Sequence, residues 1–470
     1  MDKIKTRFAP SPTGYLHIGG LRTALYSFAF AKSKGGNFLL RIEDTDRSRF
    51  VPGATERIYE ILKIFNLNWD EGPLVGGPNG PYVQSERAKE GIYQNFAQKL
   101  VDEGHAYYCF CPPQTKEEIK KEHEGKKISL RDEACRSLSK EEIEKKLKRG
   151  IKPAIRLKVP EKEKISFKDF VLRKEVTWES ENIDEVMLLK SDGFPTYHLA
   201  VVVDDYLMGI THIIRGRDWL PSTPVHLLLF KYLDFSLPEI GHLTDILDPG
   251  GGKLSKRKGT VSVEEFLKEG YLPEALLNFI MLLGWAPKDN REIFSLKEFV
   301  ENFEKGDLQI SNPVFNRVKL DWFNGHYIRQ KADEELVSLL EPFAPKDAER
   351  KTMLKITSLI KDRLVKLSDF KTYTGFFFET PEVDPCLFKD LPYNEHLSEA
   401  VAALKEIENW NNEEIQKTLG KLIEKKGWKT GDFYMSFRVA LTGSRFTPPV
   451  TESAEILGKE ETLKRLENLL

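Results

Sequence analysis

One stretch near the N-terminus combines residue types that suit the binding of an anion such as a phosphate. RFAPSPTGYLHIGG (7–20) reads as a short strand, a proline-rich turn that closes at Gly14, and the start of a helix. His17, Gly19 and Gly20 would occupy the first helical turn, where unpaired backbone N–H groups and the helix dipole favour negative charge. The two glycines also remove side chains that would hold a nucleotide at a distance.

A second stretch, DPGGGKLSKRKG (248–259), has lysines in a glycine-rich loop. Lys253 and Lys256 can both reach a phosphate if the loop folds over a nucleotide, and phosphoryl transfer needs cations where negative charge accumulates. A bare KLSKRK also resembles a nuclear-localisation or heparin-binding patch. The phosphate interpretation depends on its pairing with the first stretch.

These groups need a scaffold that brings them together, and the next segment predicts one. Residues 37–42 read as a strand, with Glu43, Asp44 and Asp46 at its C-terminal end. A strand–helix–strand unit predicts a parallel, right-handed crossover, with ligands beyond the carboxyl ends of the strands. The acidic residues and the first turn should therefore face one crevice. The alternative for Glu43 and Asp46 is a solvated loop or a helix cap.

Five motifs in order along the chain resemble those of bacterial-type glutamyl-tRNA synthetases, which are class I aminoacyl-tRNA synthetases with HIGH and KMSKS signatures. They are RFAPSPTGYLHIGG, RIEDTD (41–46), FPTYHLA (194–200), KLSKR (253–257) and LTGSRFTPP (441–449). The resemblance runs from residue 5 to the C-terminus, and the order of five motifs is far more specific than HIGG alone.

The resemblance implies ATP-dependent ligation of L-glutamate to the 3′ end of tRNA through a glutamyl-adenylate, with Mg²⁺ accompanying ATP. It also implies a fold class: an α/β Rossmann-like catalytic domain with an inserted α/β acceptor-binding subdomain, then a helical connector and an all-α anticodon-binding domain.

The resemblance further assigns site residues. The implied catalytic residues are His17, Lys253 and Lys256. The implied ATP-binding residues are Pro10, Ser11, Thr13, Gly14, His17, Gly19, Gly20, Lys253, Leu254, Ser255, Lys256 and Arg257. The implied glutamate-binding residues are Arg7, Ala9, Ser11, Glu43, Tyr197, Val201 and Arg215. An arginine suits a side-chain carboxylate because its fork can hold both oxygens.

Two positions depart from the family pattern. Val201 follows YHLA where the family commonly has Asn, which removes a potential hydrogen bond from the amino-acid pocket. RGRDW (215–219) stands where the family commonly has Arg-Gly-Glu-Glu-Trp, so Arg217 reverses a charge. These departures concern fine specificity more than the reaction.

We expect a domain scheme with five segments. They are the first half of the catalytic domain (1–105), the acceptor-end insert (106–185), the second half of the catalytic domain (186–240), a stem-contact connector with the KLSKR loop (241–320) and the all-α anticodon-binding domain (321–470). Apolar residues beyond 320 repeat at helical spacing, and few alternating strand patterns appear there. The implied anticodon contacts are Arg363, Arg438, Arg445, Thr447 and Pro448.

Three cysteines in the insert raise the question of a metal. Cys109 and Cys111 form a C-x-C pair, and Cys135 follows further on. Some relatives bind zinc here with a fourth ligand just after the third cysteine, where this chain has Ser137; His123 is the obvious substitute. Structural zinc has four ligands, so we favour a reduced, metal-free cluster and keep zinc as the alternative.

Composition limits the remaining choices. The 470 residues carry a net charge of −2 and four cysteines, which excludes a strongly basic blanket of charge and a disulfide scaffold. The N-terminus lacks the apolar core of a signal peptide, and no apolar run is long enough to span a membrane. We expect a cytoplasmic monomer that does not bind membranes.

Three other functions compete with this interpretation. A truncated paralogue that glutamylates a modified tRNA base would lack the C-terminal domain. A nucleotidyltransferase that shares only the HIGH-like turn would not need that domain. A catalytically inactive, RNA-binding or regulatory protein would have no reason to keep His17, Lys253 and Lys256.

Overall fold

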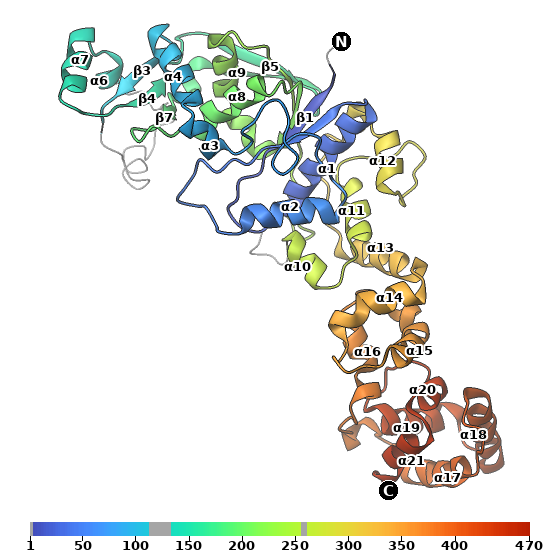
Figure 1. Cartoon of the computed structure of the whole chain (residues 1–470). Coiled ribbons are helices and arrows are strands. Elements are labelled where there is room, and N and C mark those ends of the chain that lie inside the picture. The colour runs from blue at the N-terminus through green and yellow to red at the C-terminus, as the bar shows by residue number, and fades with distance from the viewer. Residues whose placement is uncertain (1–2, 112–132, 255–260) are drawn as a thin grey trace. The chain divides into compact units, whose positions relative to one another are not determined.

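The computed structural model describes residues 3–111, 133–254 and 261–470, and it divides into two compact units (Figure 1). The first unit comprises residues 1–266 with 277–316, and the second comprises residues 267–276 with 317–470. All β-strands among the described residues lie in the first unit. In that described part of the chain, no helix is both long and apolar enough to cross a membrane.

The N-terminal strand–helix–strand unit has the predicted parallel arrangement. β1 (Lys5–Phe8) pairs in parallel with β2 (Asn37–Leu40), and α1 (Ile18–Ser33) connects them. The apolar positions at helical spacing along α1 are buried. β2 ends earlier than the predicted strand, and Ile42 instead forms an isolated bridge with Val83.

A second parallel pair lies beside the first. It consists of β8 (His212–Gly216) and β9 (Glu239–Leu243). The Thr211 N–H donates to the Lys5 carbonyl over 2.9 Å, which places β8 next to β1. The four strands therefore supply the Rossmann-like part of the predicted fold, and their carboxyl ends define the edge where ligands of such sheets bind.

The segment between these pairs forms smaller antiparallel sheets. β3 (Ala106–Cys109), β4 (Ala154–Leu157) and β7 (Met187–Leu189) form one sheet in the order β3-β4-β7. β5 (Lys164–Asp169) and β6 (Lys174–Glu179) form a hairpin. These sheets confirm the inserted α/β subdomain. Its short helices are α6 (Glu133–Arg136), α7 (Lys140–Lys148) and the 3₁₀ turn η1 (Ser180–Asn182).

Two helices follow this segment and pack on each other. The apolar stretch after residue 196 begins α8 (Tyr197–Leu207), which packs against α9 (Thr223–Tyr232). The other helices up to residue 316 are α2 (Ala54–Ile64), α3 (Gln84–Lys89), α4 (Ile92–Asp102), η2 (Arg217–Ser222), α10 (Val263–Lys268), α11 (Pro273–Met281), α12 (Leu296–Asn302) and η4 (Lys305–Asp307).

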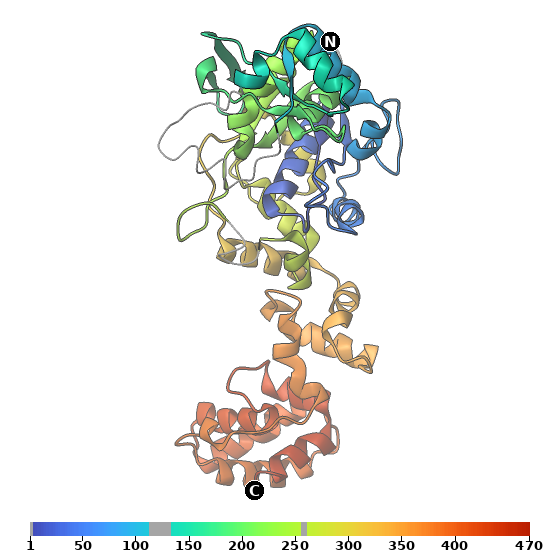
Figure 2. The ribbon, with the colours of Figure 1, turned by 90° about the vertical axis from the view of Figure 1, so that its left-hand side faces the viewer.

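The chain from residue 317 onward is helical, as the spacing of its apolar residues predicts (Figure 1, Figure 2). One buried cluster spans residues 272–370 and another spans residues 388–466. The helices are α13 (Arg317–Gln330), α14 (Asp333–Leu340), η5 (Glu341–Phe343), α15 (Arg350–Ile360), η6 (Lys361–Arg363), α16 (Asp369–Phe378), η7 (Pro385–Leu387), α17 (Tyr393–Lys405), α18 (Asn412–Lys426), α19 (Thr430–Thr442), α20 (Val450–Leu457) and α21 (Lys459–Glu467).

Candidate active site

A pocket of about 380 Å³ lies at the start of α1 and at the carboxyl ends of β8 and β9. Its volume is in the range of ligand sites. The pocket is lined by His17, Gly19, Gly20, Arg22, Thr23, Gly216, Arg217, Asp218, Leu243, Thr244, Asp245, Ile246, Lys253 and Leu254. It therefore brings together residues of the two stretches that the sequence singled out for phosphate chemistry.

His17 is the N-cap of α1. Its Nδ1 atom accepts a hydrogen bond from the Gly19 N–H over 3.1 Å, which fixes the ring at the helix start. A Cβ on Gly20 would lie 2.9 Å from Leu16 Cδ1, so a side chain there would require the end of the Leu16 side chain to move. The N–H groups of Ile18 and Gly19 are thus bonded within the protein, and the positive end of the α1 dipole faces the pocket.

The residues that follow the lysine-rich loop form hydrogen bonds with the start of α1. The Ile18 N–H donates to the Val261 carbonyl over 3.0 Å, and the Val263 N–H donates to the Leu16 carbonyl over 2.9 Å. On the near side, the Leu254 N–H donates to the Ile246 carbonyl at the pocket wall. One end of the loop therefore lines the pocket, and the other end is bonded to the start of α1. Three predicted ATP-binding residues, Ser255, Lys256 and Arg257, lie outside the described residues.

Lys253 lies at the pocket between two carboxylates. Its Nζ pairs with Asp218, and with Asp245 Oδ1 over 3.0 Å. Burial opposes the charge, but the hydrogen bonds that Lys253 donates to Asp218 and Asp245 outweigh it and raise the pKa of Lys253. The side chain is therefore cationic at neutral pH and available to an incoming phosphate that displaces one carboxylate.

The turn after β1 is joined to the acidic motif. The Glu43 N–H donates to the Pro10 carbonyl over 3.0 Å, and the Thr13 N–H donates to the Ser11 carbonyl over 2.9 Å. Ser11 and Thr13 are exposed, whereas Ala9 is half-buried; Gly14 has a φ of 133° that favours glycine. The turn and the acidic motif therefore share one region, as the sequence predicts.

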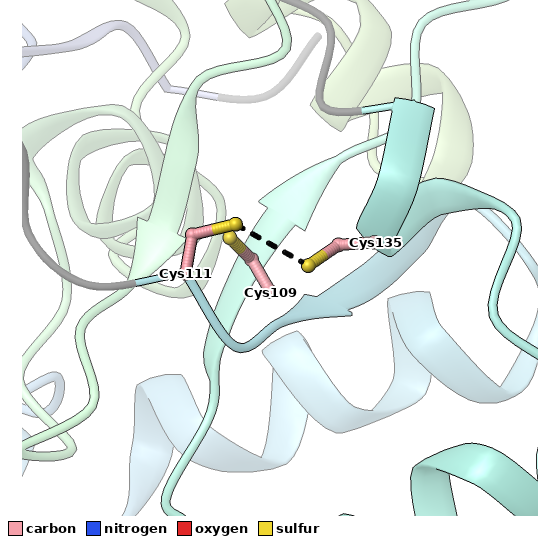
Figure 3. A group of neighbouring side chains, drawn as sticks. All are labelled: Cys109, Cys111 and Cys135. Atoms are coloured by element: carbon pink, nitrogen blue, oxygen red, sulfur yellow. Dashed lines mark hydrogen bonds between the residues drawn. The ribbon is translucent and has the colours of Figure 1, made fainter.

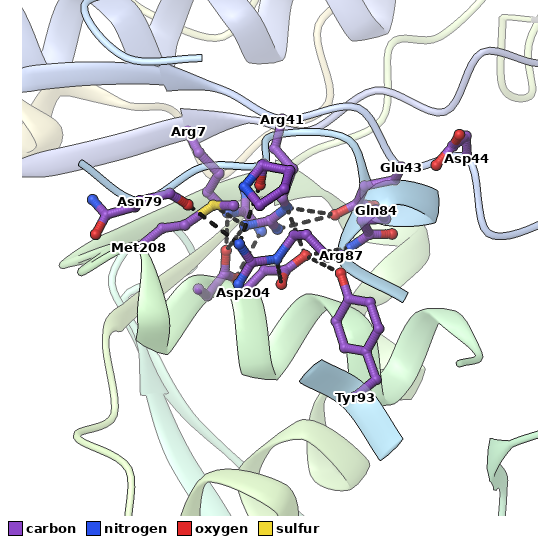
Figure 4. A network of polar contacts seen from close by, with 12 residues as sticks. Arg7, Arg41, Glu43, Asp44, Asn79, Gln84, Arg87, Tyr93, Asp204 and Met208 are labelled. Carbon is purple, nitrogen blue, oxygen red and sulfur yellow. Dashed lines mark hydrogen bonds and ion pairs between the residues drawn. The ribbon is translucent and has the colours of Figure 1, made fainter. Parts of the chain in front are cut away.

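Beneath this region lies a buried network of charged side chains (Figure 4). Arg7 Nε donates to Asp205 Oδ1 over 3.0 Å, and Arg41 Nη1 donates to the same oxygen over 2.8 Å. Arg41 Nη2 also donates to Glu43 Oε1 over 3.0 Å. The neighbouring Asp204 accepts hydrogen bonds from Arg87, Gln84 and Tyr93.

The carboxyls of this network respond differently to burial. Burial raises the pKa of Glu43, and the guanidinium groups of Arg41 and Arg7 offset this only in part. Burial also acts on Asp205, but Arg7 and Arg41 outweigh it and hold its pKa below the ordinary value. Asp205 is therefore a fixed anion that orients both arginines, whereas Glu43 would gain from a nearby ammonium group.

Asp46 behaves differently from Glu43. It lies on the surface, where Arg49 Nε donates to its Oδ2 over 2.6 Å. Hydrogen bonds from Ser48 and Arg49 lower the pKa of Asp46 to about 2. For Asp46 the structure supports the alternative of a solvated loop.

Tyr197 and Arg215 lie together at the start of α8 and the end of β8. The Tyr197 ring stacks on Trp219 at 4.0 Å between centroids, and burial raises its pKa to about 12. Arg215 is 5% exposed and donates to His242, His226 and Thr223. Val201, on α8, is only 2% exposed and belongs to a buried hydrophobic cluster. The position that departs from the family pattern is therefore an apolar one.

The three cysteines of the insert converge (Figure 3). Their sulfur atoms all lie within 4.8 Å of one another, and Cys111 Sγ is 3.6 Å from Cys135 Sγ. Three thiolates at this spacing suit a zinc ion with Zn–S bonds of about 2.3 Å, but a structural site has four ligands. Ser137 is exposed, and His123 lies outside the described residues, so the cluster has three cysteine sulfurs and no fourth ligand among the described residues.

The predicted anticodon contacts gather around one loop of the helical unit. Arg438 Nη1 donates to the Thr447 and Pro448 carbonyls over 3.0 and 2.9 Å, and Arg445 Nη1 donates to the Leu387 carbonyl over 3.1 Å. Arg363 is exposed, and its charge lowers the pKa of Arg438 in addition to the effect of burial.

Sequence reasoning missed several residues at these sites. Arg41 stands inside a quoted motif and could have been found there, but Asp205 lies outside every quoted motif. His226 and His242 carried no motif. Phe446 is 89% exposed inside LTGSRFTPP, where an exposed aromatic ring is available to stack on an unpaired base.

Comparisons with known proteins agree with this architecture. Residues 3–322 match the family described as tRNA synthetases class I (E and Q), catalytic domain, and residues 335–470 match an anticodon binding domain. The chain is 41% identical to the glutamate–tRNA ligase of Finegoldia magna, with 100% of both chains covered. It is 44% identical to that of Clostridium tetani, with 99% of this chain and 97% of the relative covered.

A comparison with solved structures also finds a glutamate tRNA ligase. The structure of a glutamate tRNA ligase from Elizabethkingia meningosepticum, in complex with its amino acid, matches with a TM-score of 0.87. It is 35% identical in sequence, and 99% of each chain is covered.

Proposed function

The chain belongs to the class I tRNA synthetases of the glutamate and glutamine type, and on that premise we propose that it ligates L-glutamate to the 3′ end of tRNA. In the first step, the α-carboxylate of glutamate attacks the α-phosphorus of ATP. A new P–O bond forms, pyrophosphate leaves, and glutamyl-adenylate results. In the second step, a hydroxyl of the terminal adenosine attacks the activated carbonyl, and AMP leaves.

The observation that carries this proposal is the pocket where the start of α1 meets Lys253. A nucleotide bound there would place its phosphates at the start of α1, near the backbone N–H of Gly20 and beside His17 and a cationic lysine. Lys256 would come from the same loop, which enters the pocket wall at Lys253 and Leu254. Mg²⁺ accompanying ATP would neutralise further phosphate charge. Catalysis needs no covalent nucleophile, because positioning and charge stabilisation suffice.

Glutamate would bind between the network around Asp205 and the side chains at the ends of α8 and β8. Arg7 and Arg215 are the proposed partners of its side-chain carboxylate, and Tyr197 lies beside Arg215. Glu43 is the proposed partner of the α-ammonium group, because a nearby cation would offset the effect of burial on its pKa. Ala9, Ser11 and Val201 complete the proposed pocket.

The helical part of the chain supports tRNA as the second substrate. The match over residues 335–470 argues against the truncated paralogue, which would lack this part. The loop with Arg438, Thr447 and Pro448, together with Arg445 and Arg363, is the proposed reader of the anticodon.

We keep the five-segment scheme with boundaries at 105, 185, 240 and 320 as a proposal, together with a monomeric state. The proposed cytoplasmic location follows from the tRNA substrate.

The decisive test is charging of purified tRNA-Glu and tRNA-Gln with labelled glutamate, with pyrophosphate exchange in the absence of tRNA as a control. We expect ATP-dependent charging of tRNA-Glu, tRNA-Gln or both. Lys256→Ala should abolish charging but keep tRNA affinity. Lys231→Ala, which removes an exposed lysine outside the pocket, should retain activity. If the wild-type chain charges neither tRNA, the enzymatic function is wrong and a regulatory RNA-binding role replaces it.

A further inference from the structure

Arg215 differs from the other buried arginines near the proposed glutamate site. Arg7 and Arg41 pair with Asp205, and Arg87 pairs with Asp204. Arg215 is equally buried, at 5% exposure, but it makes no ion pair with a carboxylate in the part of the chain that the structure describes. Asp205 acts on Arg215 only through space, and a buried charge without a directly bonded counter-ion is costly.

The partners of Arg215 are neutral hydrogen-bond acceptors. Its Nε donates to His242 Nε2 over 3.0 Å, and its Nη1 donates to His226 Nδ1 over 3.0 Å. Its Nη2 donates to Thr223 Oγ1 over 2.9 Å. These partners fix all three guanidinium nitrogens without neutralising the positive charge.

The proton positions on His242 follow from these contacts. An arginine N–H can only donate, so His242 Nε2 must accept and the ring proton must be on Nδ1. That proton is donated to Asp169 Oδ2 over 2.7 Å. Asp169 is fully buried, and its Oδ1 accepts from the backbone N–H groups of Val171 and Leu172 over 3.0 and 2.9 Å. The β5 end of the hairpin thus determines the tautomer of a histidine on β9.

The same argument applies on the other side of Arg215. His226 Nδ1 accepts from Arg215, so its proton is on Nε2, which lies 3.2 Å from His198 Nδ1. His198 must accept at Nδ1 and carry its own proton on Nε2. Both imidazoles that contact Arg215 are therefore held as acceptors by a second residue.

We propose that Asp169, His242 and His226 are positioning residues that hold Arg215 in place with its charge uncompensated, and so make the amino-acid site select a side-chain carboxylate over a carboxamide. A carboxylate in direct contact with Arg215 would already occupy the place of the substrate. Neutral imidazoles supply the orientation and leave the charge available. The inference rests on the proposed function, since it presupposes that glutamate is the substrate.

Asp169→Asn tests the inference with almost no change of shape. The Asn oxygen can still accept from Val171 and Leu172, but its NH₂ group would face His242 Nδ1. The proton of His242 would then move to Nε2, so His242 could no longer accept the hydrogen bond from Arg215 Nε. We expect the KM for glutamate to rise roughly 10- to 100-fold, the KM for ATP to stay within about twofold, and the preference for glutamate over glutamine to fall.

Substitutions at His242 separate positioning from packing. His242→Gln can place an oxygen acceptor near Arg215 Nε and should recover most of the glutamate affinity that His242→Ala loses. His212→Gln is the matched control, because His212 is a buried histidine on β8 that contacts Thr211 and Glu239 instead of Arg215. Its KM for glutamate should remain at the wild-type value.

The outcomes are distinguishable. If Asp169→Asn and His242→Ala keep the wild-type KM for glutamate, the inference is wrong even though the enzyme charges tRNA. It is also wrong if the KM values for ATP and glutamate rise together with a loss of thermal stability, since that result shows a structural role alone. If the wild-type chain fails to charge tRNA with glutamate, the proposed function itself fails.

Discussion

At the scale of single residues, the buried arginines of the catalytic unit are distinguished by what balances their charge. Arg41 is fully buried and bonds both Glu43 and Asp205; Asp205 also pairs with Arg7, so Glu43 is the carboxylate that would lose its partner without Arg41. Arg215 has neutral partners. The first arrangement stabilises the fold, and the second leaves a charge for a ligand.

Arg41→Met should therefore destabilise the protein strongly. Removing one partner of a buried ion pair typically costs about 3–5 kcal/mol, because the other charge is left unpaired. The measurement is the free energy of unfolding in urea. The control is Arg49→Ala, which removes the exposed pair with Asp46 and should cost at most about 1 kcal/mol. Equal effects of the two substitutions would contradict the structural role of Arg41.

His198 predicts a dependence of stability on pH. Burial, and then the nearby Arg215, lower its pKa from the ordinary 6.5 to about 4. The unfolded chain therefore takes up this proton first as the pH falls, and the free energy of unfolding should decrease between pH 6.5 and about 4. The loss from this one group should reach about 2 kcal/mol at pH 5.

The comparison of wild type with His198→Gln isolates that contribution. The charged and titratable groups that face His198 are Arg215, His226 and Tyr197, and all remain in the variant. The difference in unfolding free energy between the two proteins should change by about 2 kcal/mol from pH 7 to pH 5. A difference that does not change with pH would show that His198 titrates normally.

At the scale of elements, Arg438 makes several of the hydrogen bonds that hold the loop between α19 and α20, and Arg445 anchors the same loop to Leu387. Arg438, on α19, binds Thr447 and Pro448 through a single nitrogen. Gly443 begins the loop with a φ of 67°, and a Cβ there would lie 2.9 Å from Pro381 Cβ. The conformation of this loop is therefore determined by its neighbours in the helical unit.

Arg438→Met should release this loop. We expect the KM for tRNA to rise by roughly tenfold, since several hydrogen bonds to one charged group are lost, while the KM for glutamate stays unchanged. Arg363→Met removes the same charge from an exposed neighbouring position that does not hold the loop. If both variants weaken tRNA binding equally, charge alone matters and the loop-holding role is wrong.

At the scale of the whole molecule, the small net charge of −2 does not prevent recognition of a polyanion. Contacts to phosphates are local and depend on salt, because each one releases a counterion. Two phosphate contacts suffice for roughly a tenfold loss of affinity between 50 and 200 mM salt. We therefore expect the KM for tRNA to rise at least roughly tenfold when the salt concentration is raised from 50 to 200 mM.

The KM for glutamate provides the internal control in the same salt series. Its proposed ion pairs are buried and are therefore screened much less than surface contacts. It should change by about twofold or less. A KM for tRNA that stays constant with salt would show that recognition does not depend on phosphate contacts.

The sequence by itself predicted several elements and some of the residues that line the pocket, whereas the predicted Pro10, Ser11, Thr13 and Gly14 are not among its lining residues. Helical spacing after Leu16 and the parallel crossover predicted α1, β1 and β2, because burial periodicity and turn chemistry act locally along the chain. The order of the motifs predicted that His17 and Lys253 share one site, and both line the same pocket. The all-α character of the C-terminal part was predicted in the same way.

Only the tertiary structure decided which charges are balanced. Asp205 lies 198 positions from Arg7, and Asp169 lies 73 positions from His242, yet these pairs are in contact. An ion pair or a tautomer depends on distance and burial, and both arise when separate elements pack together. The same residue type therefore became a structural partner at Arg41 and an uncompensated charge at Arg215, a difference that no local pattern encodes.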